Sequence, residues 1–341
     1  MTPLAARVSA PSGDPATDAL WGYVPEPLRD LQDPSRDLPR LAKDARAMAS
    51  IESAVSRVPT SHRLLRGDAR RAQMPAESVQ LVLTSPPYWT LKEYRRSSDQ
   101  LGWIEDYDDF LEQLDQVWAV CQRALVPGGR LICVVGDVCL SRRKNHGRHT
   151  VVPLHASIQE HCRSLGFDNL APIIWHKIAN AAHEVNRGAG GFLGKPYEPN
   201  AVIKNDIEFI LMQRKGGGYR QPSLSARTLS VLSEARFRQS FRQVWTDIAG
   251  ASTRDHPAPY PISLAERLIR MFSFVGDTVL DPFTGTASTQ IAASRCGRDS
   301  VGIEVDTVYF ERALFRLRNE TNRLLSTAKV RSGEISQLTG L

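Results

Sequence analysis

Hydrophobic residues recur along the chain with two alternating periods. Short β-rich apolar runs predict strands at 78–83, 130–136, 171–175, 207–212, 278–281 and 300–306. Apolar residues at helical spacing predict helices between them, at 110–125, 151–165, 264–272 and 287–295. Strands that alternate with helices in this way indicate an α/β fold with a mostly parallel, doubly wound sheet.

Three stretches do not fit this alternation. Residues 1–40 are rich in Pro, Asp and Arg with little periodicity, and we expect regular structure to start near Leu64. The stretch 141–149 is a basic loop, and the arginine-rich stretch 213–255 contains three consecutive glycines. Insertions of this length in a compact domain are usually functional or disordered. The predicted organisation is an N-terminal arm or tail (1–60), the first half of the domain (61–212), an insertion (213–255), the second half (256–325) and a C-terminal tail (326–341).

Composition and charge limit the classes of protein to which this chain can belong. With 341 residues, 42% of them hydrophobic, the chain can bury a full core. Its net charge of +6 favours a polyanionic partner. Since no apolar run approaches the roughly 18 residues of a membrane span and the N-terminus lacks a signal-peptide pattern, we expect a cytoplasmic protein without a membrane partner. The five cysteines have no metal-type spacing, so we expect reduced thiols and no metal site.

A small-residue turn between the last predicted strands suggests a nucleoside site. The turn Asp281–Ala287 follows a strand and precedes a helix, where backbone can approach a ligand at the carboxyl edge of a parallel sheet. Glu304 lies about 20 residues beyond Gly285, the separation at which a carboxylate reaches ribose hydroxyls. The turn lacks the three glycines of dinucleotide binders, which disfavours a nicotinamide-dependent dehydrogenase. S-adenosylmethionine, a nucleoside without a pyrophosphate, fits better, although a plain structural turn is an equally good interpretation of the loop alone.

The sharpest feature is Thr84-Ser85-Pro86-Pro87-Tyr88-Trp89 at the end of a predicted strand. Two prolines stiffen the chain and leave nearby carbonyls free to accept hydrogen bonds. A base amino group is a poor nucleophile because its lone pair delocalises into the ring. Acceptors such as Ser85 Oγ and the Pro86 carbonyl would localise that lone pair, and Tyr88 would offer a face on which an extruded base can stack. The alternative is a proline-stiffened turn with incidental aromatics.

Together these residues resemble the amino-methyltransferases of bacterial restriction–modification and orphan systems. Ser85–Tyr88 matches their catalytic tetrad, and Phe283–Ala287 resembles their Phe-x-Gly-x-Gly loop. Ala287 replaces the second glycine, which is tolerable if φ at this residue is negative. The order of parts, with the tetrad first and the cofactor loop last, resembles the permuted beta class. Within that class, the stretch 256–261 looks like a segment that helps to hold the methionine portion of the cofactor.

The resemblance implies a Rossmann-like methyltransferase fold with a seven-stranded sheet, one strand antiparallel, and a flipped-out target base. The catalytic residues would be Ser85, Pro86, Pro87 and Tyr88. Glu304 would bind the ribose of S-adenosyl-L-methionine, Asp281 would lie near its methionine amino group and Asp68 would face its adenine. The full set of expected cofactor-binding residues is Asp68, Thr84, Pro261, Asp281, Pro282, Phe283, Gly285, Thr286, Glu304 and Val305.

A serine in the tetrad is commonest among N4-cytosine enzymes of this family, so methylation of cytosine N4 is favoured over adenine N6. Methylation at carbon 5 is a poor interpretation because it needs a nucleophilic cysteine, typically in Pro-Cys, and the chain has no such pair. An RNA or small-amine substrate and a catalytically idle nucleic-acid-binding protein remain alternatives.

Double-stranded DNA is the expected partner, and arginines are its expected contacts. The insertion interleaves arginines with aromatic residues and is the candidate recognition segment, while the basic loop is a second candidate. The expected DNA-binding residues are Arg142, Arg143, Arg220, Arg227, Arg236, Arg238 and Arg242. A solvated basic helix is the alternative for the insertion. The family allows a cognate restriction endonuclease that acts separately, and the chain could work as a monomer or homodimer.

Overall fold

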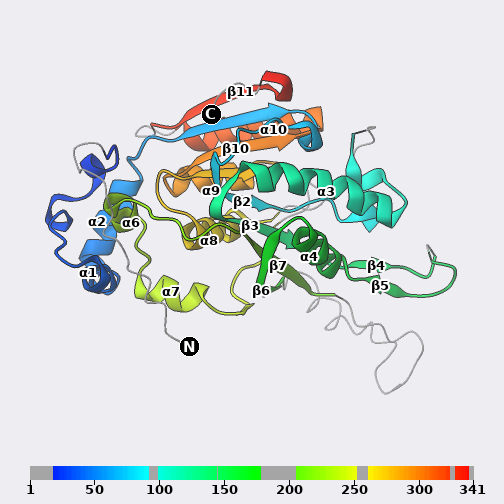
Figure 1. Ribbon diagram of the computed structural model, residues 1–341, viewed down its shortest axis with the longest axis horizontal. Coiled ribbons are helices and arrows are strands. Elements are labelled where there is room, and N and C mark those ends of the chain that lie inside the picture. Colours follow the sequence, from blue (N-terminus) through cyan, green and yellow to red (C-terminus); the bar gives the residue numbers. More distant parts are fainter. Residues whose placement is uncertain are drawn as a thin grey trace, which may run out of the picture.

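One mixed sheet organises the molecule (Figure 1). The computed structural model describes residues 18–91, 99–143, 145–177, 205–251, 260–322 and 327–337. Within them, nine strands lie in the order β11-β1-β10-β9-β2-β3-β7-β6-β8. Their bounds are β1 Ser61–Arg66, β2 Val79–Thr84, β3 Leu125–Val135, β6 Phe167–His176, β7 Ile207–Lys215, β8 Val244–Trp245, β9 Thr278–Asp281, β10 Asp299–Glu304 and β11 Lys329–Glu334.

Strand direction gives the sheet two distinct edges. All neighbouring strands pair in parallel, apart from β7, which is antiparallel to both β3 and β6. The parallel strands therefore end together at one edge, which we call the carboxyl edge, and begin together at the opposite amino edge. Because β7 runs the other way, its last residue, Lys215, lies at the amino edge. The prediction of a mostly parallel sheet is confirmed.

The predicted strand count of seven is wrong, because two edge strands extend the sheet to nine. Residues 329–334, expected within a C-terminal tail, pair with all six residues of β1 as strand β11. Arg66 Nη2 of β1 and Glu334 Oε1 of β11, 2.6 Å apart, form an ion pair between these two strands. At the opposite end of the strand order, the short strand β8 pairs with β6.

Helices cover both faces of the sheet. Helices α3 and α4 pack on one face, and α8, α9 and α10 on the other. Alternating residues of β2 supply both cores, since Val82 packs towards α3 whereas Leu81 and Leu83 pack towards α8. The helix bounds are α3 Tyr107–Ala124, α4 Leu154–Ser164, α8 Ile262–Phe272, α9 Ser288–Arg295 and α10 Thr307–Thr321.

The N-terminal region is more regular than expected. Short 3₁₀ turns at Trp21–Tyr23 and Glu26–Leu28 precede helices α1 (Pro34–Leu41) and α2 (Ala45–Val55), so regular structure starts well before Leu64. Asp44 caps α2 by accepting hydrogen bonds from the backbone of Arg46 and Ala47. The apolar face of α2 packs with Leu229 and Val275 in a small core of its own. Hydrophobic periodicity gave little sign of α1 because none of its residues is buried.

Two excursions leave the sheet at opposite edges. A two-stranded hairpin of β4 (Val138–Leu140) and β5 (Thr150–Val152) follows β3 at the carboxyl edge, so the helix expected from residue 151 begins at Leu154 instead. The insertion follows β7 at the amino edge and forms α6 (Leu224–Leu229) and α7 (Glu234–Ser240). In Figure 1 the hairpin lies on the right, whereas α6 and α7 lie on the left beside α1 and α2.

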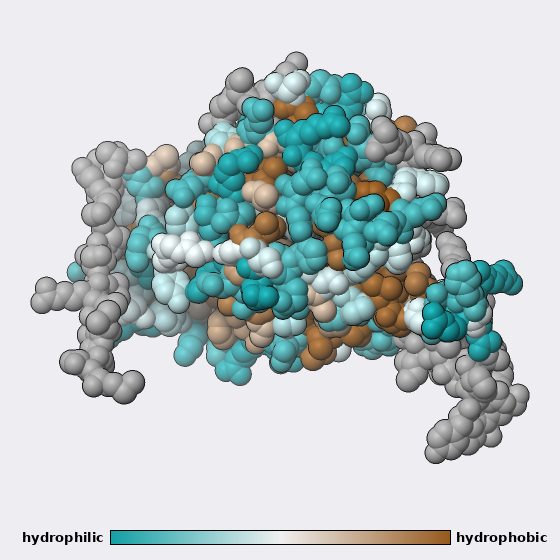
Figure 2. All heavy atoms as spheres, turned by 45° about the vertical axis from the view of Figure 1, so that its right-hand side comes forward, coloured by the Kyte–Doolittle hydropathy of each residue, from teal (hydrophilic) through white to brown (hydrophobic). Residues whose placement is uncertain are grey.

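Figure 2 shows the molecule turned so that the hairpin side of Figure 1 comes forward. The surface in this view is predominantly hydrophilic, with hydrophobic residues gathered in its lower part. None of the helices in the described part of the chain is long and apolar enough to cross a membrane.

Candidate active site

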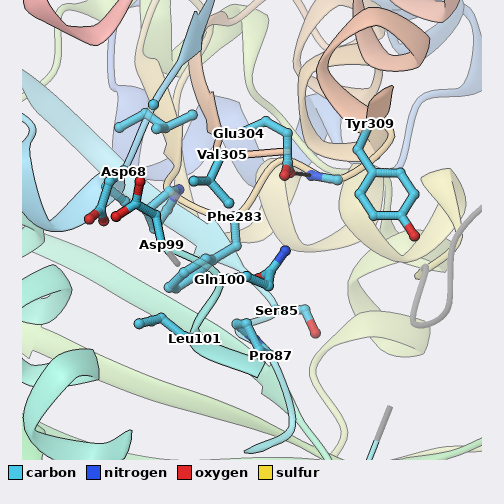
Figure 3. A pocket seen from close by; sticks show the side chains of 15 residues that line it. Asp68, Ser85, Pro87, Asp99, Gln100, Leu101, Phe283, Glu304, Val305 and Tyr309 are labelled. Atoms are coloured by element: carbon cyan, nitrogen blue, oxygen red, sulfur yellow. Dashed lines mark hydrogen bonds between the residues drawn. The ribbon is translucent and has the colours of Figure 1, made fainter. Parts of the chain in front are cut away.

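The ends of four parallel strands build a pocket at the carboxyl edge (Figure 3). Strands β1, β2, β9 and β10 end at Arg66, Thr84, Asp281 and Glu304, and the loop after each contributes to the lining. Residues that are far apart in the sequence meet here because parallel strands deliver their following loops to one edge. The lining residues are Gly67, Asp68, Ala69, Ser85, Pro87, Asp99, Gln100, Leu101, Pro282, Phe283, Gly285, Ile303, Glu304, Val305 and Tyr309.

Glu304 is a buried carboxylate in the wall of this pocket. Its Oε2 accepts a hydrogen bond from the Gly285 backbone N–H at 2.8 Å, and its Oε1 accepts one from the Asp306 N–H at 2.9 Å. Burial, which outweighs these two hydrogen bonds, raises the pKa of Glu304 to about 7. The expected spacing between the loop and this carboxylate therefore corresponds to a direct contact in the fold.

Asp281 lies behind the pocket rather than in its lining. Its carboxylate accepts hydrogen bonds from Thr84 Oγ1 at 2.7 Å, from Thr289 Oγ1 at 2.5 Å and from the Phe283 N–H at 3.1 Å. The Tyr260 hydroxyl donates a fourth at 3.3 Å. Burial raises the pKa of Asp281, while these donors lower it. In the structure, Asp281 ties β2, β9 and α9 together, and it reaches the lining only through the loop that follows it.

The Ser85–Tyr88 loop, expected to be catalytic, follows β2 directly. Ser85 and Pro87 line the pocket, and Pro86 is buried behind them. The Ser85 hydroxyl donates to the Tyr88 hydroxyl at 3.3 Å, and that hydroxyl donates to the Val134 carbonyl at 3.5 Å. Tyr88 is only 5% exposed, so its ring does not present an open face for a stacked base in this conformation.

Trp89, the next residue, has an unusual backbone conformation. Its φ is 45°, in the left-handed region that few non-glycine residues adopt. Its ring packs edge-on against Tyr107 at a centroid distance of 5.0 Å, and its buried indole N–H has no hydrogen-bond partner among the described residues. Strain and an unpaired donor beside the tetrad are typical of a functional loop.

Asp68 occupies the expected place after β1. It caps a 3₁₀ turn by accepting from the Arg70 N–H at 3.0 Å, and its carboxylate pairs with the Arg70 guanidinium at 2.7 Å. Asp99 lies near the same guanidinium at 3.8 Å. The pocket thus has an acidic rim at the end where Asp68 and Asp99 are labelled in Figure 3.

Several pocket residues escaped the sequence analysis. Asp99, Gln100 and Leu101 come from an irregular stretch before α3, and Tyr309 comes from the first turn of α10. Irregular segments carry no periodic signal, so only the fold could reveal the first three. Thr289, which donates to Asp281, was also missed, although it had a weak signal as a polar residue in the first turn after the Gly285 loop. Tyr260, which also donates to Asp281, lies within the stretch 256–261 expected beside the methionine portion of the cofactor, but it was not singled out there.

Alanine in place of the second glycine was expected to be tolerable if its φ were negative, but φ at Ala287 is positive. Its φ is 65°, so alanine occupies a left-handed position that glycine would adopt without strain. The loop nevertheless packs tightly against β10, where a side chain on Gly302 would overlap Thr284 and Gln290. The structure therefore holds Ala287 in a strained conformation where this loop meets the start of α9.

Of the expected catalytic and cofactor-binding residues, the lining contains Asp68, Ser85, Pro87, Pro282, Phe283, Gly285, Glu304 and Val305. Thr84, Pro86, Tyr88 and Asp281 are buried and do not line it. Thr286 is buried and accepts from Arg316, and Pro261 caps α8, so neither lines the pocket. The expected stretch 256–259 lies outside the described residues.

The expected DNA-binding arginines fall into two groups. Arg142 and Arg143 are exposed on the carboxyl-edge hairpin. Those of the insertion lie at the amino edge, because β7 is antiparallel. Three of these already bind carboxylates within the chain: Arg220 to Asp277, Arg236 to Glu52 and Arg238 to Glu234. The fold does not bring the insertion's described arginines to the pocket. The structure also places no cluster of three potential metal ligands among the residues it describes.

Known proteins share both the sequence and the fold. The family model for N6/N4 DNA methylases matches residues 79–315. The type II methyltransferase M.MjaI of Methanocaldococcus jannaschii is 34% identical over 280 residues, covering 73% of this chain and 88% of its own. The DNA adenine methyltransferase YhdJ of Escherichia coli is 27% identical over 295 residues, covering 82% and 91%.

A solved structure extends the likeness to three dimensions. TTHA0409 of Thermus thermophilus, an inferred DNA modification methylase crystallised with S-adenosyl-L-methionine, is 49% identical. It covers 82% of this chain and 100% of its own, with a TM-score of 0.66. The family model, the sequence relative above 30% identity and the pocket built by the Ser85 and Gly285 loops agree. This chain belongs to the N6/N4 family of DNA methylases.

Proposed function

We propose that this enzyme methylates the exocyclic N4 of cytosine in double-stranded DNA, acting on a base flipped out of the helix. The observation that carries the proposal is that Ser85 and Pro87 line the same pocket as Gly285 and Glu304. The Ser85 loop is suited to polarise an amino group, and Gly285 with Glu304 is suited to hold a nucleoside. Their meeting in one pocket supports methyl transfer between two ligands bound side by side.

The methyl donor is S-adenosyl-L-methionine, and the residues present fit it. Glu304 offers a buried carboxylate as an acceptor for ribose hydroxyls, and Phe283 and Leu101 offer apolar surface for a purine. Asp68, on the acidic rim, would face the adenine. Bound there, the cofactor supplies a sulfonium methyl group as the electrophile. Asp281 supports the site indirectly by fixing the loop that carries Phe283 and Gly285.

The catalytic loop would prepare the amino group for attack. Ser85 Oγ and the Pro86 carbonyl would accept hydrogen bonds from the amino group, which would draw the nitrogen towards tetrahedral geometry and localise its lone pair. As the new N–C bond forms, the bond between the methyl group and the sulfonium sulfur would break, and the amino nitrogen would release one proton to solvent. Positioning and electrostatics then supply the rate enhancement, without a covalent enzyme intermediate. Stacking of the base on Tyr88 requires the buried ring to become accessible, and the strained Trp89 backbone beside it is the natural place for that movement.

The choice of base rests on Ser85. A serine at this position favours N4-cytosine by resemblance, whereas the family and its relatives include adenine enzymes. The test is to incubate the protein with methyl-labelled S-adenosyl-L-methionine and unmethylated duplex DNA, digest the DNA to nucleosides and identify the product by mass spectrometry. N4-methylcytosine is the expected product. N6-methyladenine would show that adenine is the target base, and the absence of any labelled nucleoside from DNA of diverse sequence would refute DNA as the substrate.

We further propose that the β4–β5 hairpin contacts the phosphates beside the target base. It is the described basic segment at the carboxyl edge, where Arg142 and Arg143 are exposed. Replacing both with Gln should lower duplex affinity and reduce the salt dependence by about 1.8 in log–log slope, the value for two phosphate contacts. Arg238→Gln with Arg242→Gln removes the same charge at the amino edge and is the control. An unchanged slope for the hairpin variant, or an equal loss for the control, would contradict this contact.

A further inference from the structure

A second cavity lies at the amino edge of the sheet, whereas the pocket lies at the opposite, carboxyl edge. Its volume is about 760 Å³, which is large enough for one or two nucleotides. It is bounded by the beginnings of β2 and β3, the segment before β9, the insertion and the end of α1. Neither the methyl-transfer chemistry nor the hairpin uses it. We call it the amino-edge cleft.

Cations outnumber carboxylates in the lining of this cleft: it contains one carboxylate, Glu234, which lies near Lys43 and already pairs with Arg238. Lys43, Arg130, Arg227 and Arg270 all contribute to its wall, and none makes a side-chain hydrogen bond or ion pair within the described part of the chain. The Arg130 guanidinium is half-buried, and its burial together with nearby Arg214 lowers its pKa. A guanidinium removed from water without an anion is costly, so the cleft favours an anionic ligand.

The cations that do have partners have another role. Arg220 binds Asp277 through two hydrogen bonds of 2.6 Å, and its guanidinium lies over the Phe274 ring at 5.4 Å. This pair anchors the insertion to the segment before β9. It therefore forms a fixed wall, against which the unpaired cations are held.

Aromatic rings lie between the cations. Phe237 and Phe241 stack on each other with centroids 4.6 Å apart, yet they are 52% and 50% exposed. Tyr219 is 79% exposed, and Phe272 lies 5.3 Å beneath the Arg130 guanidinium. Exposed rings offer stacking faces to unpaired bases, whereas the bases of a duplex already stack on each other.

We propose that the amino-edge cleft binds single-stranded DNA, as a second nucleic-acid site separate from the catalytic pocket. Cationic side chains that track a backbone, interleaved with rings that stack bases, are the two components of sequence-tolerant single-strand binding. A second copy of this chain fits less well. A two-fold interface places the same patch on both partners, which would oppose these unpaired cations to one another.

The proposal is tested with a probe that the catalytic site cannot methylate. A fluorescein-labelled oligodeoxythymidine contains no exocyclic amino group, so its binding can be measured whether or not the proposed methylation is correct, and the cleft variants show how much of that binding the cleft supplies. Binding is followed by fluorescence anisotropy on the full chain over a series of salt concentrations. The unmodified protein is expected to bind, with affinity that falls as salt rises.

Two sets of variants separate charge from stacking. Lys43→Gln with Arg270→Gln should weaken binding about tenfold and reduce the salt slope by about 1.4. Phe237→Ala with Phe241→Ala should weaken it about ten- to a hundredfold and keep the slope. Arg46→Gln with Arg57→Gln, at exposed positions outside the cleft, removes the same charge and should change affinity by less than about twofold. Methyl transfer to duplex DNA, unchanged in both cleft variants, shows that they fold.

Three outcomes would overturn the proposal. One is an unmodified protein that does not bind the probe, and another is cleft variants that bind it as tightly as the control. The third is found by sedimentation velocity: if the cleft variants convert a dimer into a monomer, the cleft is a self-association surface.

Discussion

The two edges of the sheet carry different kinds of residue. At the carboxyl edge, the pocket is built from short loops that follow strands directly, and its polar groups are mostly acidic or neutral. At the amino edge, the cleft is built from the insertion and α1, and its charged groups are mostly basic. Short loops on strand ends hold groups rigidly, which suits catalysis, whereas the cleft has the broad cationic and aromatic surface of a binding site.

One strand direction decides which edge the insertion occupies. Had β7 been parallel to β3, the chain after Lys215 would have emerged at the carboxyl edge, on the same side as the Ser85 loop. Instead, β7 pairs antiparallel with β3, from Arg130 opposite Arg214 to Val135 opposite Phe209. The insertion that follows β7 therefore starts at the amino edge. A contiguous arginine-rich stretch is therefore not by itself evidence for a target-recognition surface.

The largest expected effect tests the carboxyl edge. Ser85→Ala removes one proposed hydrogen-bond acceptor for the amino group and should lower the rate of methyl transfer about a hundred- to a thousandfold, as loss of one preorganised catalytic hydrogen bond does. Single-turnover transfer to duplex DNA measures the rate, and calorimetric titration measures cofactor affinity, which should stay within about twofold. Equal loss of both would refute the assigned role.

Ser78→Ala is the matched control for that variant. Ser78 precedes the other end of β2, and its hydroxyl donates to the Pro75 carbonyl at 2.7 Å. Its loss should cost no more than about 1 kcal/mol of stability and leave the transfer rate unchanged.

The next effect tests the amino edge. Arg220→Gln leaves Asp277, only 8% exposed, without its bidentate partner, and should lower the free energy of unfolding by about 3 kcal/mol. Urea unfolding measures it. Arg238→Gln, which removes an exposed partner of Glu234, should change stability by less than about 0.5 kcal/mol. If Arg220→Gln instead kept full stability and weakened duplex binding, the amino edge would be the DNA contact after all.

A smaller effect comes from Glu304. Glu304→Gln replaces a carboxylate that would accept ribose hydroxyls, and should weaken cofactor binding about ten- to a hundredfold, as loss of a charged hydrogen-bond partner does. Titration calorimetry measures the affinity. Unchanged affinity would mean that the ribose lies elsewhere.

The same variant should change the pH dependence of stability. The folded state keeps the Glu304 proton up to a pKa of about 7, whereas the unfolded chain loses it near the ordinary glutamate pKa of 4.5. Between these values the folded state binds more protons, so raising the pH destabilises the unmodified protein. Gln does not titrate. The variant should therefore gain about 2 to 3 kcal/mol relative to the unmodified protein between pH 4.5 and 7. A constant difference over that range would show that folding does not raise the pKa of Glu304.

The sequence predicted the carboxyl edge better than the amino edge for a physical reason. The strand at 278–281, the turn at Gly285 and the carboxylate of Glu304 are linked by local spacing, so the sequence predicted their proximity. The contact of Asp281 with Tyr260 depends on how separate segments pack. Likewise, nothing local signals that Arg220 reaches Asp277, or that α2 packs against α6. Such contacts are set by strand order and direction, which periodicity does not encode.

The smallest expected effect concerns Ala287, where two forces oppose each other. Ala287→Gly would relieve left-handed strain of about 1 to 2 kcal/mol. It would also lose a buried methyl, worth about 0.8 kcal/mol, and add backbone entropy to the unfolded chain, worth about 0.5 to 1 kcal/mol. The net change in unfolding free energy should therefore stay within about 1 kcal/mol. Ala292→Gly, equally buried but inside α9, loses a methyl with no strain to relieve and should cost about 1.5 to 2 kcal/mol. Urea unfolding of both variants gives the comparison: an equal loss at the two positions would mean that the positive φ of Ala287 costs nothing, and that the cofactor loop is held without strain.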